Sequence, residues 1–397
     1  MGISKKIEAA LVRSSWIRKM FEEGGRLKAI HGDANVFDFT LGNPNLPPPA
    51  RFKTALLETV QSLEPCCHGY MPNSGYPFAR KAIADQVSAE RGVVMTADGV
   101  VLTVGAAGAL NVVLKSVLDP GEEVVVPAPY FVEYGFYVDN HGGVLKTVPT
   151  QPDFTLDLDA IAGALSEKTR VVLINFPNNP TGQVYSQESL DALGRLLSEK
   201  SEAYGSPIYL VSDEPYRKLV YDDISPADIL KSYSDSIIVT SYSKDISIPG
   251  ERLGYAAVSP RAGDGKLLMD AMTFANRTLG FVNAPALMQR VVCAVQGEAA
   301  DMAAYARKRD LICGGLADAG YEFTAPRGTF YVFPKTPIPD DVAFVGALQE
   351  ELILAVPGSG FGGPGYFRIA FCVDDETIVK ALPGFKKVIE KVKAEKG

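Results

Sequence analysis

The chain carries the sequence IIVTSYSK at residues 237–244, followed by PGERLGY at residues 249–255. The apolar half of the first stretch predicts a β-strand, so the polar half emerges from the end of that strand. A lysine in such a place is usually a solvated charge. Burial and nearby cations can instead lower the pKa of Lys244 and free its amine to form a Schiff base with an aldehyde. Ser241 and Arg252 can hold a phosphate, the arginine through a bidentate pair. The spacing of these three residues favours a functional site.

The surrounding sequence predicts an α/β fold. Short β-rich runs alternate with helix-period stretches such as 106–118 and 187–202. The predicted strands are 100–104, 123–127, 144–148, 171–175, 208–212, 236–240 and 254–259. Apolar strands that alternate with helices indicate a mostly parallel, seven-stranded sheet covered by helices on both faces. Ligands bind beyond the carboxyl ends of the strands in such sheets, and the motif at 241–244 falls at one of those ends.

A length of 397 residues exceeds a single compact core and predicts two domains. We assign residues 46–289 to a large α/β domain. Residues 1–45 and 290–397 together form a smaller α+β domain. The helical pattern near 14–31, a long helix from about 290, short strands at 329–333 and 366–371, and a charged helix that ends at Gly397 belong to the smaller domain.

Composition excludes several classes of function. The net charge of −8 argues against nucleic-acid binding, and no apolar run approaches the roughly 18 residues of a membrane span. The first residues lack the apolar core of a signal peptide, so we expect a cytoplasmic protein without membrane contact. Five scattered cysteines, Cys66 among them, form no disulfide framework, and three isolated histidines add no metal-ligand spacing. We therefore expect no metal.

Three further motifs follow predicted strands. Asp213 closes the strand in YLVSDEPY (209–216), and a buried carboxylate there needs a partner such as a protonated pyridine nitrogen. Tyr216 can donate its phenol to a ring oxygen. Asn179, in NFPNNPTG (175–182), can bond both a cofactor oxygen and a substrate carboxylate, although such a stretch also serves as an ordinary turn. In TVGAAGAL (103–110) a strand passes into a helix whose first N–H groups can seat a phosphate.

Together and in this order, these motifs resemble the class I/II aminotransferases, which are fold type I pyridoxal-phosphate enzymes. The resemblance runs from LGNP (41–44) to GYFRIA (365–370). It implies that Lys244 carries the cofactor as a Schiff base and that Asp213 pairs with the pyridine nitrogen. The other implied cofactor contacts are Tyr216 and Asn179 at the ring oxygen, Phe131 stacked on the ring, and Gly105, Ala106, Ala107, Ser241 and Arg252 at the phosphate.

The same resemblance implies a substrate site and a partner. Arg368 resembles the arginine that binds the substrate α-carboxylate, with the backbone of Gly42 beside it. Tyr70 resembles the tyrosine that reaches the phosphate of a neighbouring subunit, which implies a homodimer with shared active sites. One departure lies in the phosphate loop, where many relatives have Lys or Gln and this chain has Ala107 and Gly108.

The predicted reaction is transfer of an amino group between an L-amino acid and a 2-oxo acid such as 2-oxoglutarate. Arg277 resembles the distal-carboxylate arginine of some aspartate aminotransferases, which favours an aspartate-like substrate; aromatic or neutral amino acids are the alternative. A pyridoxal-phosphate lyase or decarboxylase on the same fold is a second alternative, because fold does not fix the reaction. The effector domain of a transcription regulator is a third, but too few residues precede the predicted fold for a DNA-binding module.

Overall fold

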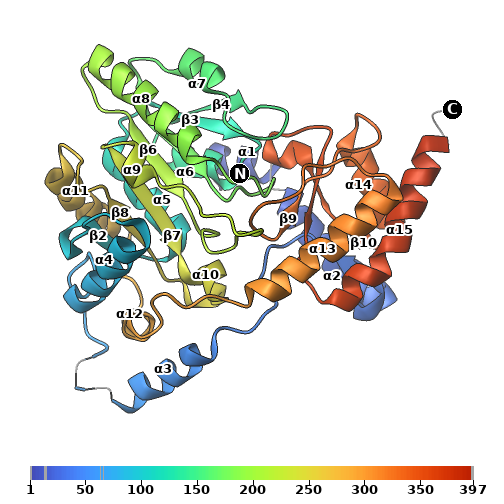
Figure 1. Cartoon of the computed structure of the whole chain (residues 1–397), viewed down its shortest axis with the longest axis horizontal. Helices are drawn as coiled ribbons and strands as arrows, with labels where there is room; N and C mark the ends of the chain where they lie inside the picture. The colour runs from blue at the N-terminus through green and yellow to red at the C-terminus, as the bar shows by residue number, and fades with distance from the viewer. Residues whose placement is uncertain (1, 13–15, 63, 66, 395–397) are drawn as a thin grey trace.

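The computed structural model describes residues 2–12, 16–62, 64–65 and 67–394. A seven-stranded sheet lies at its centre in the order β2-β8-β7-β6-β5-β3-β4 (Figure 1). The strands are β2 (Val100–Thr103), β3 (Glu123–Ala128), β4 (Val144–Pro149), β5 (Thr169–Asn175), β6 (Tyr209–Asp213), β7 (Ser236–Ser241) and β8 (Gly254–Val258). Only β8 runs antiparallel to its neighbours. The predicted fold class is confirmed, and every predicted strand overlaps an observed one.

Helices cover both faces of this sheet (Figure 1). One face packs against α5 (Gly105–Val117), α6 (Glu133–Asn140) and α11 (Gly265–Thr278). The other face packs against α4 (Pro77–Arg91), α7 (Leu158–Ala164), α8 (Gln187–Tyr204), α9 (Ile229–Ser232) and α12 (Ala286–Cys293). The helix α3 (Ala50–Gln61) lies apart from the sheet and packs against α12 (Figure 1). Successive strand residues alternate between the two hydrophobic clusters: Val211 belongs to the first and Leu210 to the second. Among the described residues, no helix is both long enough and apolar enough to cross a membrane.

A second hydrophobic core joins the two ends of the chain. It contains Met20 and Phe39 from the first part of the chain and many residues between 300 and 392. Its elements are α2 (Trp16–His31), β1 (Phe37–Asp38), α13 (Met302–Ala319), β9 (Tyr331–Val332), α14 (Asp341–Glu350), β10 (Ile353–Leu354), β11 (Val356–Pro357), β12 (Phe367–Ala370) and α15 (Asp375–Ala394). Since β1 pairs with β10, the two ends are held together by backbone hydrogen bonds. This arrangement supports the proposed small domain, whose boundaries stay a prediction.

The helix predicted from about residue 290 is interrupted. The helix α12 ends at Cys293 and α13 begins at Met302. Gly297 lies between them with φ +83°, a left-handed conformation that a continuous helix does not contain. Asp301 then caps α13, because its side chain accepts a hydrogen bond from the Ala304 amide. Parts of two other predicted helices, at residues 14–15 and 395–397, lie outside the described residues, as does Cys66.

The carboxyl edge of the sheet brings the sequence motifs together. The strands β5, β6 and β7 end there at Asn175, Asp213 and Ser241, and β2 enters α5 nearby. The antiparallel strand β8 starts at the same edge with Gly254. A Cβ atom at Gly254 would lie 2.5 Å from the Thr240 carbonyl oxygen and 2.7 Å from the Gly105 carbonyl carbon. Glycine therefore allows the chain after Arg252 to pass close to the start of α5.

Candidate functional site

A cavity of about 820 Å³ opens at this edge of the sheet. The predicted site residues that line it are Gly42, Ala106, Ala107, Phe131, Asn179, Asp213, Tyr216, Ser241, Lys244, Arg252 and Arg368. They come from both hydrophobic cores, because Tyr216 packs with the second core and Phe131 with the first sheet face. The folded chain thus collects residues from positions 42 to 368 around one space.

Lys244 lies in the short helix α10 (Tyr242–Asp245) that follows β7. Its Nζ donates a 2.6 Å hydrogen bond to the Gly42 carbonyl and stands 5.7 Å from the centre of the Phe330 ring. The pKa of Lys244 is lowered to about 8, chiefly by burial; Cys372 opposes this effect, and the positive charges of Arg368 and Arg252 add to it. A substantial fraction of this amine is therefore neutral near pH 8, as a nucleophile or a general base requires.

Gly42 must be glycine at this site. A Cβ atom there would lie 1.8 Å from the hydroxyl oxygen of Tyr331, which is far inside van der Waals contact. The hydroxyl of Tyr331 in turn lies 3.0 Å from that of Tyr216. The lysine, the glycine carbonyl and the two phenols therefore form one connected wall of the cavity.

Asp213 is buried at the end of β6 and is held from one side only. Its Oδ2 accepts a 2.6 Å hydrogen bond from the hydroxyl of Tyr134, whereas its Oδ1 has no partner among the described residues. Burial raises the pKa of Asp213 to about 7; the Tyr134 hydrogen bond opposes this effect and the charge of Glu214 adds to it. A buried carboxylate oxygen without a partner is suited to a cationic N–H group of a ligand.

Sequence reasoning missed Tyr134. It lies in α6, three residues after Phe131, and the two rings meet edge to face with centres 5.6 Å apart. Phe131 lies just before α6, and its carbonyl accepts a hydrogen bond from the Tyr134 amide at 3.1 Å, so helical spacing does not relate the two rings. The sequence could not show that the phenol reaches Asp213, because 79 residues separate the two.

The start of α5 and Arg252 form a cationic corner of the cavity. Gly105 has φ +70°, and a Cβ atom there would lie 2.5 Å from Nη2 of Arg252. Nη1 of Arg252 donates to the Pro249 carbonyl at 2.8 Å, which holds the guanidinium in place. Ala106, Ala107 and the hydroxyl-bearing Ser241 line the cavity beside it. Free N–H groups at a helix start together with a guanidinium are suited to a phosphate.

Arg368 is a second cation, fully buried on β12. Its guanidinium donates to the Thr40 carbonyl at 2.5 Å and to Oδ1 of Asn179 at 3.0 Å. The rings of Tyr331 and Phe361 lie 4.5 Å and 4.6 Å from its central carbon. Burial lowers the pKa of Arg368, and its hydrogen-bond partners here are neutral oxygens. A ligand carboxylate would supply the negative charge that such a buried cation requires.

Three predicted residues do not line this cavity: Gly105, Tyr70 and Arg277. Gly105 is buried at the start of α5 beside Arg252. Tyr70 is 94% exposed, and Arg277 is exposed at the end of α11, where its guanidinium lies 5.2 Å from the ring centre of Phe274. The predicted role of Tyr70 involves the phosphate of a neighbouring subunit, and that of Arg277 involves a distal carboxylate of the substrate. Both roles stay predictions. Conversely, the sequence did not indicate Ile7 and Leu11 of α1 (Lys5–Val12), which add apolar lining at the cavity mouth.

The residues present fit pyridoxal phosphate. The cavity joins a lysine of lowered pKa, a buried carboxylate oxygen that lacks a partner, and a cationic corner with helix N–H groups. These are the groups that an aldehyde, a protonated ring nitrogen and a phosphate require. The aromatic ring of Phe131 lines the same cavity.

The chain is similar to known aminotransferases. A family model described as aminotransferase class I and II matches residues 34–384. The aspartate/prephenate aminotransferase of Thermus thermophilus is 32% identical over 362 residues, which cover 88% of this chain and 90% of that protein. A crystal structure of an amino transferase from Eubacterium rectale has a TM-score of 0.95 and 38% identity, with 98% of this chain and 99% of that one covered. A solved structure of the Thermus thermophilus aspartate aminotransferase with maleate has a TM-score of 0.87 and 29% identity, with 98% and 100% covered.

Replacing Tyr134 with phenylalanine tests the environment of Asp213. The Tyr134→Phe change removes the hydrogen bond that favours the ionised carboxylate, so the pKa of Asp213 rises and less of it is charged at pH 7. A hydrogen bond to a charged group contributes about 1.5–3 kcal/mol, so we expect pyridoxal phosphate to bind about tenfold to a hundredfold more weakly. Titration of the cofactor-free protein measures this. Tyr130→Phe, on the neighbouring stacked ring, is the control; equal affinities of the two variants would contradict the role of Tyr134.

Proposed function

The chain belongs to the aminotransferase class I and II family, and from this premise we propose that it uses pyridoxal phosphate to move an amino group between an L-amino acid and a 2-oxo acid. One observation carries the proposal. The amine of Lys244, the unpartnered oxygen of Asp213 and the guanidinium of Arg368 line the same cavity. A covalent anchor, a ring partner and a carboxylate receptor are thereby available to one bound substrate.

Each of these residues has a separate chemical task. The cofactor, when bound, supplies an electron-poor ring that stabilises negative charge on the substrate α-carbon. Lys244 would hold the cofactor, and its free amine would take the proton from the substrate α-carbon as general base. Its pKa of about 8 keeps part of the amine neutral for this step. Asp213 holds the ring nitrogen in its protonated form.

Arg368 and Asn179 orient the substrate. The side-chain oxygen of Asn179 accepts from Arg368, and its backbone N–H donates to Asn175 at 2.7 Å, so both groups are fixed before a substrate arrives. A bidentate contact from Arg368 to the α-carboxylate sets the rotation about the bond to the α-carbon. The bond to hydrogen can then stand perpendicular to the ring, close to Lys244.

Removal of Lys244 tests the reaction. Purified protein should show the visible absorbance of bound pyridoxal phosphate, which shifts on addition of an amino-acid donor and returns with 2-oxoglutarate. In Lys244→Ala we expect turnover to fall by at least about 10²–10⁴-fold, the usual contribution of a general base, whereas the cavity still binds cofactor through its other contacts. Near-normal turnover would contradict the assignment. Elimination or decarboxylation products in place of a 2-oxo acid would favour the lyase alternative.

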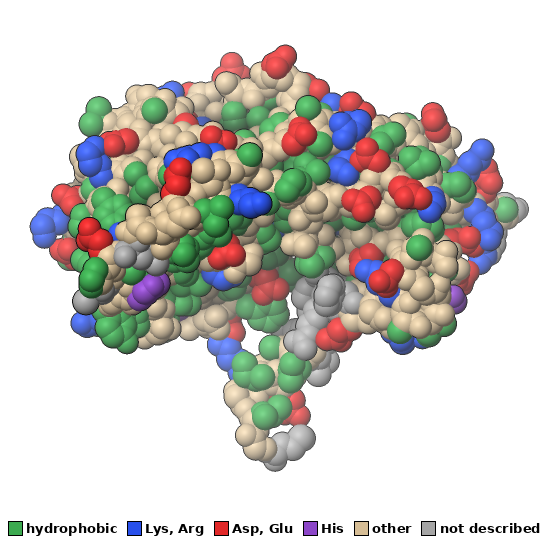
Figure 2. All heavy atoms as spheres, turned by 90° about the horizontal axis from the view of Figure 1, so that it is seen from below, with side chains coloured by type: hydrophobic (Ala, Val, Ile, Leu, Met, Phe, Trp, Pro, Cys, Tyr) green, Lys and Arg blue, Asp and Glu red, His purple; other side chains and the backbone are tan. Residues whose placement is uncertain are grey.

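We also propose a homodimer whose active sites are shared. Large apolar side chains are exposed on α3 and in the segment that follows it: Leu57, Val60 and Tyr70 are 54%, 51% and 94% exposed. Hydrophobic side chains gather on the left of the face seen from below, the side on which α3 lies (Figure 2). A second copy that covers this surface would bury these side chains and could bring Tyr70 to the cationic corner of its partner.

Sedimentation equilibrium tests the dimer. We expect twice the mass of the 42.6 kDa chain. A Tyr70→Phe variant should remain dimeric but bind pyridoxal phosphate about tenfold to a hundredfold more weakly, since it loses a hydrogen bond of about 1.5–3 kcal/mol to a charged phosphate. Tyr76→Phe, whose hydroxyl bonds the Cys67 carbonyl within the chain, is the matched control. A fully active monomer would overturn the proposal.

The proposed donor is aspartate-like, by analogy with the relatives and through Arg277. Because Arg277 does not line the cavity of its own chain, it could contact a substrate only across the dimer interface. A specific observation favours the alternative of neutral or aromatic donors: the cavity mouth is lined by Ile7, Leu11, Leu41 and Phe136. These side chains give a distal carboxylate no partner.

Comparison of two donors separates these possibilities. If Arg277 binds the distal carboxylate, Arg277→Ala removes one partner of an interfacial charge pair and lowers kcat/KM for aspartate about a hundredfold or more, while alanine is unaffected. Arg195→Ala, at an exposed position on α8, is the control. Equal effects on aspartate and alanine would show that Arg277 does not read the side chain. Faster turnover of phenylalanine than of aspartate by the unmodified enzyme would favour the apolar alternative.

A further inference from the structure

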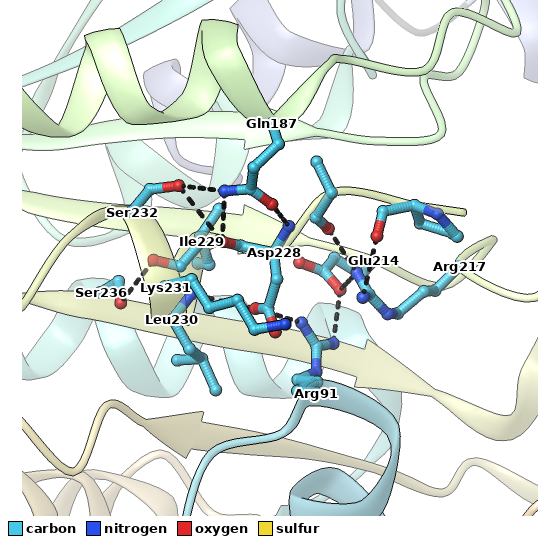
Figure 3. A network of polar contacts seen from close by, with 12 residues as sticks. Arg91, Gln187, Glu214, Arg217, Asp228, Ile229, Leu230, Lys231, Ser232 and Ser236 are labelled. Carbon is cyan, nitrogen blue, oxygen red and sulfur yellow. Dashed lines mark hydrogen bonds and ion pairs between the residues drawn. The ribbon is translucent and has the colours of Figure 1, made fainter. Parts of the chain in front are cut away.

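An ion-pair network surrounds Glu214, the residue after Asp213, and Figure 3 shows its members. Arg91, Glu214 and Asp228 are buried, and Arg217 is partly buried. Arg91, the last residue of α4, points into it and contacts Oε2 of Glu214 at 2.6 Å and Oδ1 of Asp228 at 3.1 Å. Arg217 also reaches Oε2 of Glu214, at 3.2 Å. Two cations and two carboxylates thus neutralise one another, and three of the four side chains are at most 5% exposed.

The network is joined to Asp213 through one peptide bond. Asp213 and Glu214 are consecutive, so their side chains leave the chain on opposite faces. Asp213 bonds Tyr134 on the face covered by α6, and Glu214 bonds Arg91 on the face covered by α4. The backbone between them is also fixed, since the Glu214 amide donates to the Val239 carbonyl at 2.8 Å and Thr240 donates to the Glu214 carbonyl at 3.0 Å. Rotation of this segment would move both carboxylates together.

The network is also linked to Asp213 by charge. The negative charge of Glu214 adds to burial in raising the pKa of Asp213. Burial opposes ionisation of Glu214 itself, but Arg91 and then Arg217 prevail and lower the pKa of Glu214. Glu214 is therefore a permanent anion next to the carboxylate that must be ionised to pair with a ring nitrogen. Arg91 supplies the nearest compensating charge.

We propose that Arg91 is a positioning residue for Asp213, acting through Glu214 from the opposite face of the sheet. It fixes the direction in which the Asp213 carboxylate leaves the strand, and it offsets the charge of Glu214 that would otherwise repel an ionised Asp213. The inference rests on the proposed function, because it assumes that Asp213 pairs with the pyridine nitrogen of the cofactor.

The dissociation constant of pyridoxal phosphate, measured against pH on the cofactor-free protein, tests this inference. In Arg91→Met the charge of Glu214 is compensated only by Arg217, so the pKa of Asp213 rises. The acid limb of the binding curve, where affinity falls because Asp213 becomes protonated, therefore moves to higher pH. An upward move of one pKa unit gives a roughly tenfold weaker affinity on that limb. In Glu214→Gln the neighbouring anion is gone, and the acid limb moves to lower pH. The opposite signs of the two shifts are the signature of charge coupling.

Other groups around Asp213 are the same in all variants. Tyr134 and Tyr137 of α6, Tyr216 after β6 and Lys244 of α10 line its surroundings. Arg217, Asp228 and Tyr255 surround the Arg91–Glu214 pair itself. A difference between variants therefore reports the loss of one charge from this network. Lys308→Met is the matched control for loss of a buried cation, because Lys308 is buried on α13 and pairs with Asp375 at 2.8 Å. We expect it to lower the unfolding midpoint without a change in the pH profile.

The outcomes separate the inference from the function on which it rests. If the unmodified protein binds no pyridoxal phosphate, the proposed function fails. If it binds and the pH profiles of Arg91→Met and Glu214→Gln match it, with only the unfolding midpoint lowered, Arg91 is structural and the inference is overturned. Should Arg91→Met fail to fold, Glu214→Gln alone decides, because it keeps the side-chain shape and predicts a shift to lower pH.

Discussion

Burial of charge at one edge of the sheet is the constraint on which the rest of the structure depends. Lys244, Asp213 and Arg368 are all withdrawn from water around one cavity, and no ion pair among the described residues joins them to one another. Desolvation of an isolated charge is costly, so each group must shift its pKa, gain neutral hydrogen bonds or await a charged ligand. The pKa values of all three groups are shifted, and Arg368 also donates to the neutral oxygens of Thr40 and Asn179. All three groups can still bind a charged ligand.

The two faces of the sheet treat buried charge differently. On the cavity face the ionisable groups are kept apart and incompletely paired. On the opposite face Arg91, Glu214, Asp228 and Arg217 are paired closely, and the carboxylate of Asp228 also caps α9 by accepting from the Leu230 amide. The period-two alternation of a strand lets consecutive residues belong to these two environments. The network holds the end of β6 behind the unpaired carboxylate of Asp213. Because its two cations balance its two carboxylates, it adds no net charge there.

The sequence predicted the elements that depend on local pattern. The strands were found because they are apolar on both faces, and Lys244, Asp213, Asn179 and Arg368 were found because they follow strands or carry family motifs. The roles proposed for them stay predictions. Contacts between distant segments were not predictable: Arg91 reads as an ordinary last-turn arginine of a helix, and its partner Glu214 lies 123 residues away. The break between α12 and α13 was missed because a single glycine and a capping aspartate outweighed helical periodicity.

The buried network behind the site has a consequence for stability. Replacement of a buried ion pair by well-packed apolar residues is often neutral or stabilising, whereas removal of one partner alone costs about 3–5 kcal/mol. A chain selected only for stability would therefore gain little from Arg91 and Glu214. Their presence is more readily explained by a requirement for direction and charge at Asp213 than by a contribution to the hydrophobic cores. Proteins commonly keep such locally unfavourable arrangements where function depends on them, and here that place is the carboxyl end of β6.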